Sequence, residues 1–403
     1  MIVRDKCVIC GSKNLYNALN LGLMPSSNDL PTVENLEKVH EYELKYYMCQ
    51  DCGLFQLLEI ADRSDLFDNY LYLTGVNKEL VEHFRELYHN VAAQMSKRDF
   101  AIVIGSNDGT EVELLRNEGG FKSVIGIEPA KNIAAKANSL GRTTINTFFT
   151  FDVSNKVVKK YGKADLVVAN NVFAHIPDPR DMLNGMKNLI NPNGKIIIEV
   201  HWLKSIVEKL EFETLYAEHY YVWTVKAMNI LANQCGLKLI NVLYMPQQHG
   251  GSLRFTLSES GENDLKLMKD EEMSGLYEKS TMDLLQKRAE DRKNSLNGLI
   301  AKLNANSKRI AIWSVPAKVP TLINYCGLTK KDIVCAYEVA DSKIGRYIPK
   351  ANIPIKNEDS LKTDMPDYLI IGAWNYMDFA IKKLKWYTDA GGKLINPLTA
   401  EVL

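Results

Sequence analysis

Ala101-Ile-Val-Ile-Gly-Ser-Asn-Asp-Gly-Thr110 and Val124-Ile-Gly-Ile-Glu128 are the two stretches that decide the fold of this chain. Each begins as a short apolar strand; the first then turns through two glycines, and the second ends on a carboxylate. A buried strand that turns through glycine into a helix lets backbone N–H groups approach a ligand closely. An acidic residue at the end of the next strand can accept hydrogen bonds from both hydroxyls of a ribose. The pattern therefore predicts a parallel βα sheet that binds a nucleoside.

The spacing of the glycines narrows the ligand. Glycine occupies the first and fifth positions of the loop 105–109, which differs from the G-x-G-x-x-G of pyrophosphate-binding folds. The loop instead resembles the glycine loop of S-adenosylmethionine (SAM) methyltransferases. The resemblance implies that these residues contact the cofactor: Gly105, Ser106, Asn107, Asp108, Gly109, Glu128 and, at the end of a third strand, Asn170 and Asn171. An ordinary turn between strand and helix and an NAD site are the alternatives.

Composition excludes several classes of protein. The chain has 403 residues, which suggests two or three domains, and its 46% hydrophobic and 24% charged residues are typical of a globular protein. Lys+Arg and Asp+Glu number 49 each, so the net charge is zero and no broad positive field favours nucleic acid. Neither a signal peptide nor an apolar run of membrane-spanning length is evident. We expect a cytoplasmic protein with no nucleic-acid and no membrane partner.

Two cysteine pairs near the start of the chain predict a metal site. Cys7-x-x-Cys10 and Cys49-x-x-Cys52 are each followed by a glycine, which permits the tight turn that directs both sulfurs of a pair to one ion. Four thiolates complete a tetrahedral zinc site and leave no position for substrate or water. We therefore predict a structural zinc ion; disulfides are the weaker alternative in a reducing compartment.

Strand and helix patterns alternate through the rest of the chain. They predict a helix over 77–95, strands over 165–169 and 195–200 with a turn at 191–194, a helix that starts at Asp178-Pro179, two strands within 238–257, a long solvated helix within 258–308, strands over 310–313, 333–337 and 368–371, and a closing helix. No internal repeat is evident. The predicted fold class is α/β, with a zinc-binding domain (1–70), a class I, Rossmann-like methyltransferase domain with the linking helix (71–305) and a smaller C-terminal α/β domain (306–403).

In this order the pieces resemble the zinc-containing, SAM-dependent C-methyltransferases of deoxysugar biosynthesis, which act on nucleotide-linked 4-keto-deoxysugars at C3. The resemblance covers essentially the whole chain. It is carried by the two Cys-x-x-Cys pairs, the glycine loop, and the stretches 170–178, 216–219, 249–254 and 373–376. It implies SAM and structural zinc as cofactors, a nucleotide-linked deoxysugar as substrate, and a monomer or small homo-oligomer. The chain departs from the family at the turn 313–318, where Trp-Ser-Val-Pro-Ala-Lys replaces the usual Gly-Tyr-Gly-Ala turn and only Ala317-Lys318 keep the pattern. A turn without glycine leaves less room for the backbone to approach a phosphate.

The stretch Tyr216-Ala-Glu-His219 is the expected centre of the chemistry. A carbon next to a ketone becomes nucleophilic when a base removes its proton, and the enolate oxygen then needs hydrogen-bond donors. A helix would group Tyr216 with His219, whereas a strand would group Tyr216 with Glu218. We therefore expect an irregular loop, or a role for Glu218 in orienting His219. The alternative is that His219 is a half-buried structural histidine.

The resemblance assigns roles to further residues. It implies His219 as the base with Glu218 and Tyr216 assisting, and it adds His175 and Tyr72 to the catalytic group. The predicted substrate-binding residues are Tyr70, His249, Gly250, Gly251, Arg254, Lys318, Trp374 and Asn375. Structural roles remain open: core packing for the two tyrosines and Trp374, a turn cap for His175, and a strand-start turn for the glycine pair.

Three functions are compatible with these observations. The leading hypothesis is a C-methyltransferase that deprotonates the carbon alpha to the ketone of a nucleotide-linked keto-deoxysugar. The second is an O- or N-methyltransferase on the same kind of substrate. The third is a zinc-bearing RNA- or protein-binding module that has lost catalysis, against which the neutral charge and the Tyr216, Glu218 and His219 group both argue.

Overall fold

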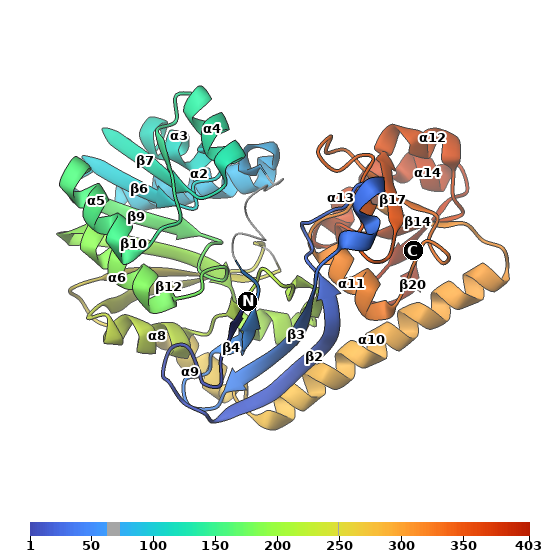
Figure 1. The fold of residues 1–403 in the computed structure, drawn as a ribbon, viewed down its shortest axis with the longest axis horizontal. Helices are drawn as coiled ribbons and strands as arrows, with labels where there is room; N and C mark the ends of the chain where they lie inside the picture. Colours follow the sequence, from blue (N-terminus) through green and yellow to red (C-terminus); the bar gives the residue numbers. More distant parts are fainter. Residues whose placement is uncertain (63–72, 249) are drawn as a thin grey trace. The chain divides into compact units, whose positions relative to one another are not determined.

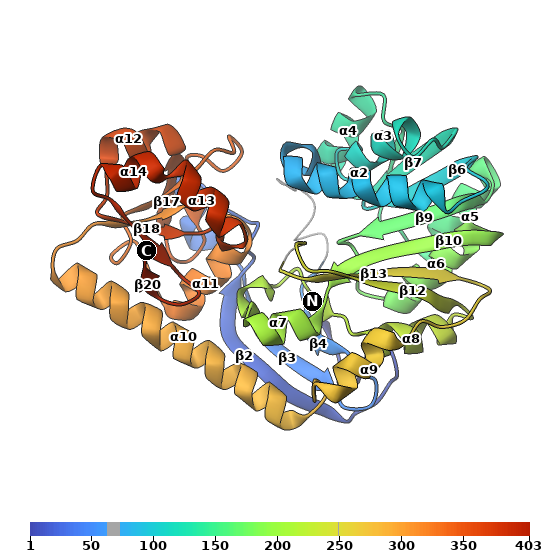
Figure 2. The same cartoon turned by 180° about the vertical axis from the view of Figure 1, so that it is seen from behind.

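The computed structural model describes residues 1–62, 73–248 and 250–403 and divides the chain into two compact units. The first unit comprises 1–16, 47–205 and 220–277, and the second comprises 17–46, 206–219 and 278–403. Figures 1 and 2 show the ribbon from opposite sides. The predictions for Tyr70, Tyr72 and His249 lie outside the described residues.

The first unit is built on a seven-stranded sheet in the order β12-β13-β10-β9-β6-β7-β8. Its strands are β6 (Phe100–Ile104), β7 (Ser123–Glu128), β8 (Thr144–Asn146), β9 (Ala164–Asn170), β10 (Ile190–His201), β12 (Lys238–Met245) and β13 (Ser252–Ser258). The strands β10, β9, β6, β7 and β8 are parallel, which confirms the predicted doubly wound sheet, and β13 and β12 add antiparallel strands. The turn predicted at 191–194 lies inside β10, as a break in register between Ile190 and Lys195.

Helices cover both faces of this sheet: α2, α3 and α4 lie on one face and α6 and α8 on the other (Figures 1 and 2). The helices of this part of the chain are α2 (Lys78–Ala93), α3 (Thr110–Asn117), α4 (Lys131–Ser139), α5 (Phe151–Tyr161), α6 (Pro179–Leu189), α7 (Leu203–Lys209), α8 (Val225–Gln234) and α9 (Lys266–Met273). Apolar residues of α2 at helical spacing, such as Phe84 and Leu87, pack with β6 and β9 in one core cluster. As predicted, Asp178 caps α6, and its side chain accepts hydrogen bonds from Arg180 N and Asp181 N.

The N-terminal segment forms smaller sheets. Its strands are β1 (Ile2–Val3), β2 (Leu15–Pro25), β3 (Glu41–Cys49), β4 (Phe55–Leu57) and β5 (Glu59–Ile60), joined by β11 (Tyr221–Val222). The four-stranded sheet has the order β11-β4-β3-β2, and β1 pairs with β5. The boundary between the two units falls within β2 and within β3. Short 3-10 helices lie at η1 (Val33–Lys38), η2 (Thr74–Val76) and η3 (Phe212–Thr214).

The second unit contains another seven-stranded sheet, in the order β16-β17-β15-β14-β18-β19-β20. Its elements are β14 (Ile310–Trp313), α11 (Lys318–Cys326), β15 (Cys335–Glu338), β16 (Tyr347–Ile348), β17 (Ile353–Asn357), η4 (Glu358–Ser360), α12 (Leu361–Asp364), β18 (Tyr368–Ile371), η5 (Trp374–Tyr376), α13 (Met377–Lys383), α14 (Lys385–Asp389), β19 (Lys393–Asn396) and β20 (Glu401–Val402). The strands β17, β15, β14, β18 and β19 are parallel. The smaller C-terminal α/β fold is therefore confirmed.

The prediction of one long solvated helix within 258–308 is wrong in two respects. The segment forms α9 and the separate helix α10 (Lys279–Ala305), with a break that contains Gly275. One stripe of α10 is buried, and the stripe includes Arg292, whose guanidinium donates to the carbonyl of Leu210 at 2.6 Å and lies 3.3 Å from a carboxylate oxygen of Glu213. Its charge is therefore paired in the interior, because helical periodicity places it among the apolar residues that face the core.

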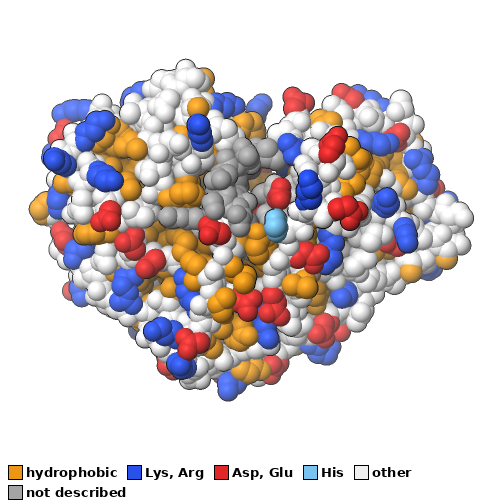
Figure 3. All heavy atoms as spheres, viewed as in Figure 1, with side chains coloured by type: hydrophobic (Ala, Val, Ile, Leu, Met, Phe, Trp, Pro, Cys, Tyr) orange, Lys and Arg blue, Asp and Glu red, His pale blue; other side chains and the backbone are white. Residues whose placement is uncertain are grey.

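Figure 3 shows how charged side chains are distributed on one face of the molecule. On the face in Figure 3, acidic and basic side chains are interspersed, in keeping with the zero net charge. Within the described residues, no helix has both the length and the apolar character needed to cross a membrane.

Candidate functional site

The four predicted zinc ligands lie together in the first unit. Their sulfur atoms are all within 4.8 Å of one another, and Cys7 Sγ lies 3.5 Å from Cys52 Sγ. The two pairs form matching turns, in which the N–H of Gly11 donates to Cys7 O at 3.0 Å and the N–H of Gly53 donates to Cys49 O at 2.8 Å. Both glycines have positive φ, near +75°, so glycine is the favoured residue there. The donor set fits a tetrahedral zinc ion, and because all four ligands are cysteines the site is structural.

The glycine loop 105–109 connects β6 to α3 in the predicted way. Gly105 has a φ of +68°, and its N–H donates to Ile127 O of the neighbouring strand β7 at 2.8 Å. A Cβ on Gly105 would lie 2.3 Å from the side chain of Val172. Glycine is therefore required here both for the backbone conformation and for the close approach of another segment.

Glu128 lies at the carboxyl end of β7, beside this loop. One carboxylate oxygen accepts from Asn107 N at 3.0 Å and the other from Ala130 N at 2.8 Å, and only 6% of the residue is exposed. Burial raises the pKa of this carboxyl, while the two backbone N–H groups oppose the shift. Each oxygen has a second lone pair, so the two amides hold the carboxylate in place and leave acceptor capacity for ribose hydroxyls.

Two side chains of the loop, Asn107 and Asp108, have internal partners. Asn107 accepts from Thr74 N at 2.8 Å, and Asp108 accepts from Gly75 N at 3.1 Å and from the Thr110 hydroxyl at 2.7 Å. Ser106 is buried, and its hydroxyl, which has no hydrogen-bond partner among the described residues, lies 2.2 Å from the place of a Cβ on Gly126. These contacts indicate that the side chains shape the loop, so that the backbone of 105–109 is the part available for a ligand.

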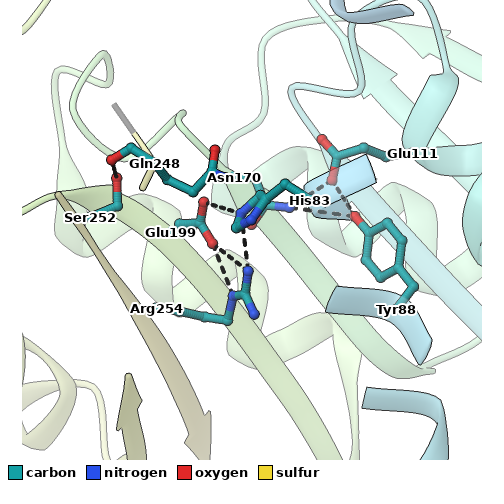
Figure 4. A network of polar contacts seen from close by, with 8 residues as sticks. All are labelled: His83, Tyr88, Glu111, Asn170, Glu199, Gln248, Ser252 and Arg254. Atoms are coloured by element: carbon teal, nitrogen blue, oxygen red, sulfur yellow. Dashed lines mark hydrogen bonds and ion pairs between the residues drawn. The ribbon is translucent and has the colours of Figure 1, made fainter. Parts of the chain in front are cut away.

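Asn170, drawn in Figure 4, ends β9 at the same edge of the sheet, and Asn171 follows it in the chain. The Asn170 amide nitrogen donates to Glu111 of α3 at 2.6 Å, and Tyr88 of α2 also donates to Glu111. Asn171 has a φ of +56°, and its N–H donates to Glu199 O at 2.8 Å. The side-chain oxygens of both asparagines are buried without a hydrogen-bond partner among the described residues.

Glu111 did not enter the predicted site. Its only signal in the sequence is its place in the first turn of the helix that comes after the glycine loop.

These residues fit SAM. Glu128 would accept hydrogen bonds from the ribose hydroxyls, and Gly105, which has no side chain, lets the backbone of the loop approach the cofactor closely. The side-chain oxygens at the end of β9 that have no hydrogen-bond partner among the described residues suit a donor such as an α-ammonium group.

Arg254, on β13, forms hydrogen bonds with residues of neighbouring elements. Arg254 donates to Glu199 of β10 at 2.9 Å and is buried, and His83 Nε2 lies 2.7 Å from the other Glu199 oxygen (Figure 4). Burial alone would raise the pKa of Glu199, but His83 and the charge of Arg254 outweigh it and hold the pKa below its usual value. This pairing gives Arg254 a partner within the sheet, and its role as a diphosphate clamp stays a prediction.

The two glycines before β13 and His175 lie in turns. Gly250 and Gly251 have positive φ, the N–H of Gly251 donates to Gln248 O at 2.7 Å, and a Cβ there would lie 2.3 Å from the Ser205 hydroxyl. His175 is half-buried, and its N–H donates to Val172 O at 2.9 Å. The fold therefore places these residues in turns, and their predicted substrate-binding and catalytic roles stay predictions.

Tyr216, Glu218 and His219 belong to the second unit, on the irregular loop that the spacing predicted. His219 N donates to Tyr216 O at 2.8 Å, and the two rings lie 3.9 Å apart at an angle of 31°. His219 Nδ1 is 2.6 Å from Thr214 O. Because a carbonyl oxygen only accepts, Nδ1 carries the hydrogen, and the lone pair of the neutral ring is on Nε2.

Glu218 has partners other than His219. One carboxylate oxygen accepts from the Ser26 hydroxyl at 2.9 Å, from Asn28 N at 3.1 Å and from the Asn28 amide at 3.2 Å. Burial raises its pKa, and these hydrogen bonds oppose the shift. The carbonyl of Thr214 thus holds the imidazole, whereas Glu218 ties the loop to the segment immediately after β2.

Three predicted substrate residues lie together at the start of α11. Lys318 Nζ is 4.3 Å from the centre of the Trp374 ring and donates to the side-chain oxygen of Asn375. Burial lowers the pKa of Lys318 to about 8, although Glu213 and Glu211 counteract the shift.

The neighbouring strand β15 ends on Glu338, a residue absent from the predicted site. One of its oxygens accepts from Val315 N at 3.0 Å and the other from Val339 N at 2.8 Å. A short apolar strand with an acidic end is the signal that located Glu128, and it is present here too.

Three family models match successive parts of the chain. They are described as "Putative zinc binding domain" (residues 7–67), "Methyltransferase domain" (84–242) and "C-methyltransferase C-terminal domain" (247–399). The C-methyltransferase NovU of Streptomyces niveus is 28% identical over 403 residues, which cover 98% of this chain and 95% of that protein. The order of the matches agrees with the order of the zinc ligands, the glycine loop and the second α/β fold.

Solved structures resemble part of the chain. A SAM-dependent methyltransferase of Clostridium acetobutylicum is 9% identical, with 45% of this chain and 92% of that chain covered and a TM-score of 0.36. The magnesium protoporphyrin IX methyltransferase of Synechocystis PCC 6803 with bound SAM is 12% identical, with 45% and 82% covered and a TM-score of 0.33. At these scores the likeness supports no conclusion about this chain.

Proposed function

We propose that this chain, which belongs to the zinc-containing SAM-dependent C-methyltransferases, methylates the carbon alpha to the ketone of a nucleotide-linked keto-deoxysugar, at C3 of a 4-keto sugar. The observation that carries the proposal is the hydrogen bond between His219 Nδ1 and Thr214 O. It fixes the tautomer of the imidazole and directs the basic lone pair to Nε2.

His219 is the proposed general base. It takes the proton from the substrate carbon onto Nε2 and becomes an imidazolium, whose charge the Thr214 carbonyl stabilises through Nδ1–H. The Tyr216 ring packs against the imidazole and brings a phenol hydroxyl to the same loop. That hydroxyl is the proposed donor to the enolate oxygen that forms as the proton leaves. Bound SAM supplies the methyl group as an electrophile.

Lys318 is the proposed contact for the diphosphate of the sugar nucleotide. Its ammonium is held by Asn375 and by the Trp374 face at the first turn of α11, where a helix N-terminus also favours an anion. With a pKa of about 8, Lys318 is mostly charged at neutral pH. Tyr72, Tyr70, His175 and His249 keep their predicted roles in this proposal.

The test is proton exchange of the substrate in D₂O, with the turnover measured in parallel. The wild-type protein should incorporate deuterium at the carbon alpha to the ketone, and His219→Asn should lower exchange and turnover by about 10²–10⁴. His40→Asn is the matched control, because His40 is exposed in the same unit, and it should behave as wild type. SAM affinity should be the same in all three proteins. Exchange at the wild-type rate in His219→Asn would remove this residue as the base.

The same experiment separates the alternative functions. Methyl transfer to oxygen or nitrogen without exchange at carbon would support an O- or N-methyltransferase. Binding of SAM with neither exchange nor transfer, across dTDP-, GDP-, CDP- and UDP-linked keto sugars, would support a binding protein that has lost catalysis.

A further inference from the structure

A buried carboxyl that the proposed reaction does not use lies beside the cofactor-binding edge of the first unit. Glu111, in the first turn of α3, is only 5% exposed. Its Oε2 atom accepts from Asn170 Nδ2 at 2.6 Å and from the hydroxyl of Tyr88 (Figure 4). The three residues come from α3, β9 and α2, so the hydrogen bonds connect two helices to the end of a strand.

These hydrogen bonds determine which way the Asn170 amide faces. Since a carboxylate only accepts, the amide nitrogen faces Glu111 and the amide oxygen faces away from it. That oxygen has no hydrogen-bond partner among the described residues, although Asn170 is only 5% exposed. A buried acceptor without a donor is costly, so a ligand that supplies the donor would be stabilised at this position.

The place and the charge around Asn170 indicate the ligand. The registers of β6 and β9, with Val103 opposite Val168, bring Asn170 to the edge at which the glycine loop begins. Asp108, Glu111 and Glu128 are all buried at this edge, whereas Glu199 is paired with Arg254. The electrostatic field of the three carboxylates that have no cationic partner among the described residues is negative and favours a cationic hydrogen-bond donor. SAM carries such a donor, its α-ammonium group.

We propose that Glu111 is a positioning residue of the SAM site, whose carboxylate holds the Asn170 amide so that Oδ1 accepts a hydrogen bond from the α-ammonium of SAM. Glu111 itself does not touch the cofactor. It acts through Asn170, and Tyr88 supports it from α2.

The arrangement makes SAM affinity depend on pH. Burial raises the pKa of Glu111 to about 7, Tyr88 and Asn170 oppose the shift through their hydrogen bonds, and the charges of Glu199 and Asp108 add to it. The ionised carboxylate is the stronger acceptor for the amide, and it attracts the ammonium. SAM binding therefore favours the ionised form, so affinity should fall as the pH falls through about 7.

The test is calorimetric titration of the full chain with SAM between pH 6.0 and 7.5. Wild-type affinity should fall roughly three- to tenfold over this range, since a tenfold change corresponds to about one unit of pKa difference between free and bound protein. Glu111→Gln keeps an acceptor for Asn170 but cannot titrate, so it should bind SAM with an almost flat profile. Glu111→Leu removes the acceptor and should weaken SAM binding by about tenfold at pH 7.5.

Controls separate this role from a merely structural one. Glu86→Gln, an exposed change on α2, should keep the wild-type profile. The ammonium of SAM titrates in every protein alike, so the ratio of wild type to Glu111→Gln cancels it. Tyr88→Phe removes one hydrogen bond to the carboxylate and should move the inflection to higher pH.

A second readout needs no cofactor. Because the folded pKa of Glu111 lies above the unfolded value of about 4.3, the folded protein binds the extra proton, and wild-type stability should rise as the pH falls from about 7 to about 4.5, relative to Glu111→Gln. The same pH profile of SAM affinity in wild type and Glu111→Gln, or unchanged affinity in Glu111→Leu, would overturn the proposal.

Discussion

The sheets of the two units repeat the same backbone arrangement, but a buried side chain at the start of the following helix is acidic in one unit and basic in the other. In both, the parallel strands have the order third-second-first-fourth-fifth, with β6 and β14 as the first strands. The residue after the first strand has positive φ, +68° at Gly105 and +66° at Ser314, and its N–H donates at 2.8 Å to the residue before the acidic end of the second strand. Glu128 and Glu338 then each bind a backbone N–H of that turn at 3.0 Å.

The two arrangements differ in the helix that begins after each turn. In the first unit the helix begins with Thr110 and the buried carboxyl of Glu111, whereas in the second it begins with buried Lys318. A cationic ligand such as SAM suits the first turn, and an anionic ligand such as a diphosphate suits the second. In the proposed assignment, the backbone arrangement sets where each ligand binds, and one side chain in the adjoining helix selects the charge of that ligand.

The largest expected effect comes from removing the two acidic strand ends in turn. Glu128→Ala should weaken SAM binding at least tenfold, because hydrogen bonds to a charged acceptor contribute roughly 1.5–3 kcal/mol each. Glu338→Ala should leave SAM affinity unchanged, because it belongs to the second unit's turn. Calorimetry on both variants checks this, and equal losses would show that the two turns do not bind different ligands.

The next effect concerns close packing, which requires glycine at different places in the two units. A Cβ at Gly105 would lie 2.3 Å from Val172, and a Cβ at Gly372, after β18, would lie 1.9 Å from the Ser314 carbonyl oxygen. Gly372→Ala should therefore reduce the free energy of unfolding by about 1–3 kcal/mol without changing SAM affinity. Gly105→Ala should reduce both.

Gly298 provides the matched control for this experiment. It lies inside α10 with no atom near a new Cβ, so Gly298→Ala should stabilise the protein by up to about 1 kcal/mol. Chemical denaturation measures all three variants. A neutral Gly372→Ala would contradict the close contact between the two turns of the second unit.

The last expected effect concerns Lys318 at the turn of the second unit. Lys318→Met should weaken the binding of a nucleoside diphosphate sugar by about tenfold, the loss of one charge-assisted hydrogen bond, and should not alter SAM binding. A lysine is charged below its pKa, so wild-type affinity for the nucleotide should fall as the pH rises through about 8, and the Lys318→Met profile should be flat there. Unchanged nucleotide affinity in the variant would remove Lys318 from the substrate site.

Local patterns in the sequence were enough to identify the parts of the molecule that depend on neighbours in the chain. The two cysteine turns, the strand-to-helix turn at Gly105 and the acidic end of β7 each need only a few consecutive residues, and each was predicted. The domain boundaries at 70 and 305 stay predictions, because the compact units combine segments far apart in the sequence.

Partners across the fold could not be predicted in the same way. Arg254 was predicted from the glycine pair beside it, whereas its partner Glu199 lies opposite it in the pairing of β13 with β10. Glu218 was a candidate to orient His219, but Ser26 and Asn28, distant in sequence, bind its carboxylate. A buried charge is stable only when it is paired or hydrogen-bonded, and the packing of the elements determines which residue is its partner.

The sequence by itself determined the fold class, the four-cysteine cluster and the glycine turn beside the acidic end of β7, because strand periodicity, glycine spacing and cysteine spacing are local properties of the chain. The tertiary structure alone decided the tautomer of His219, the orientation of the Asn170 amide and the likeness of Glu338 to Glu128. Each of these depends on a hydrogen bond whose donor and acceptor come from different elements. The energy of such a bond, and the pKa that it sets, exist only after those elements have packed.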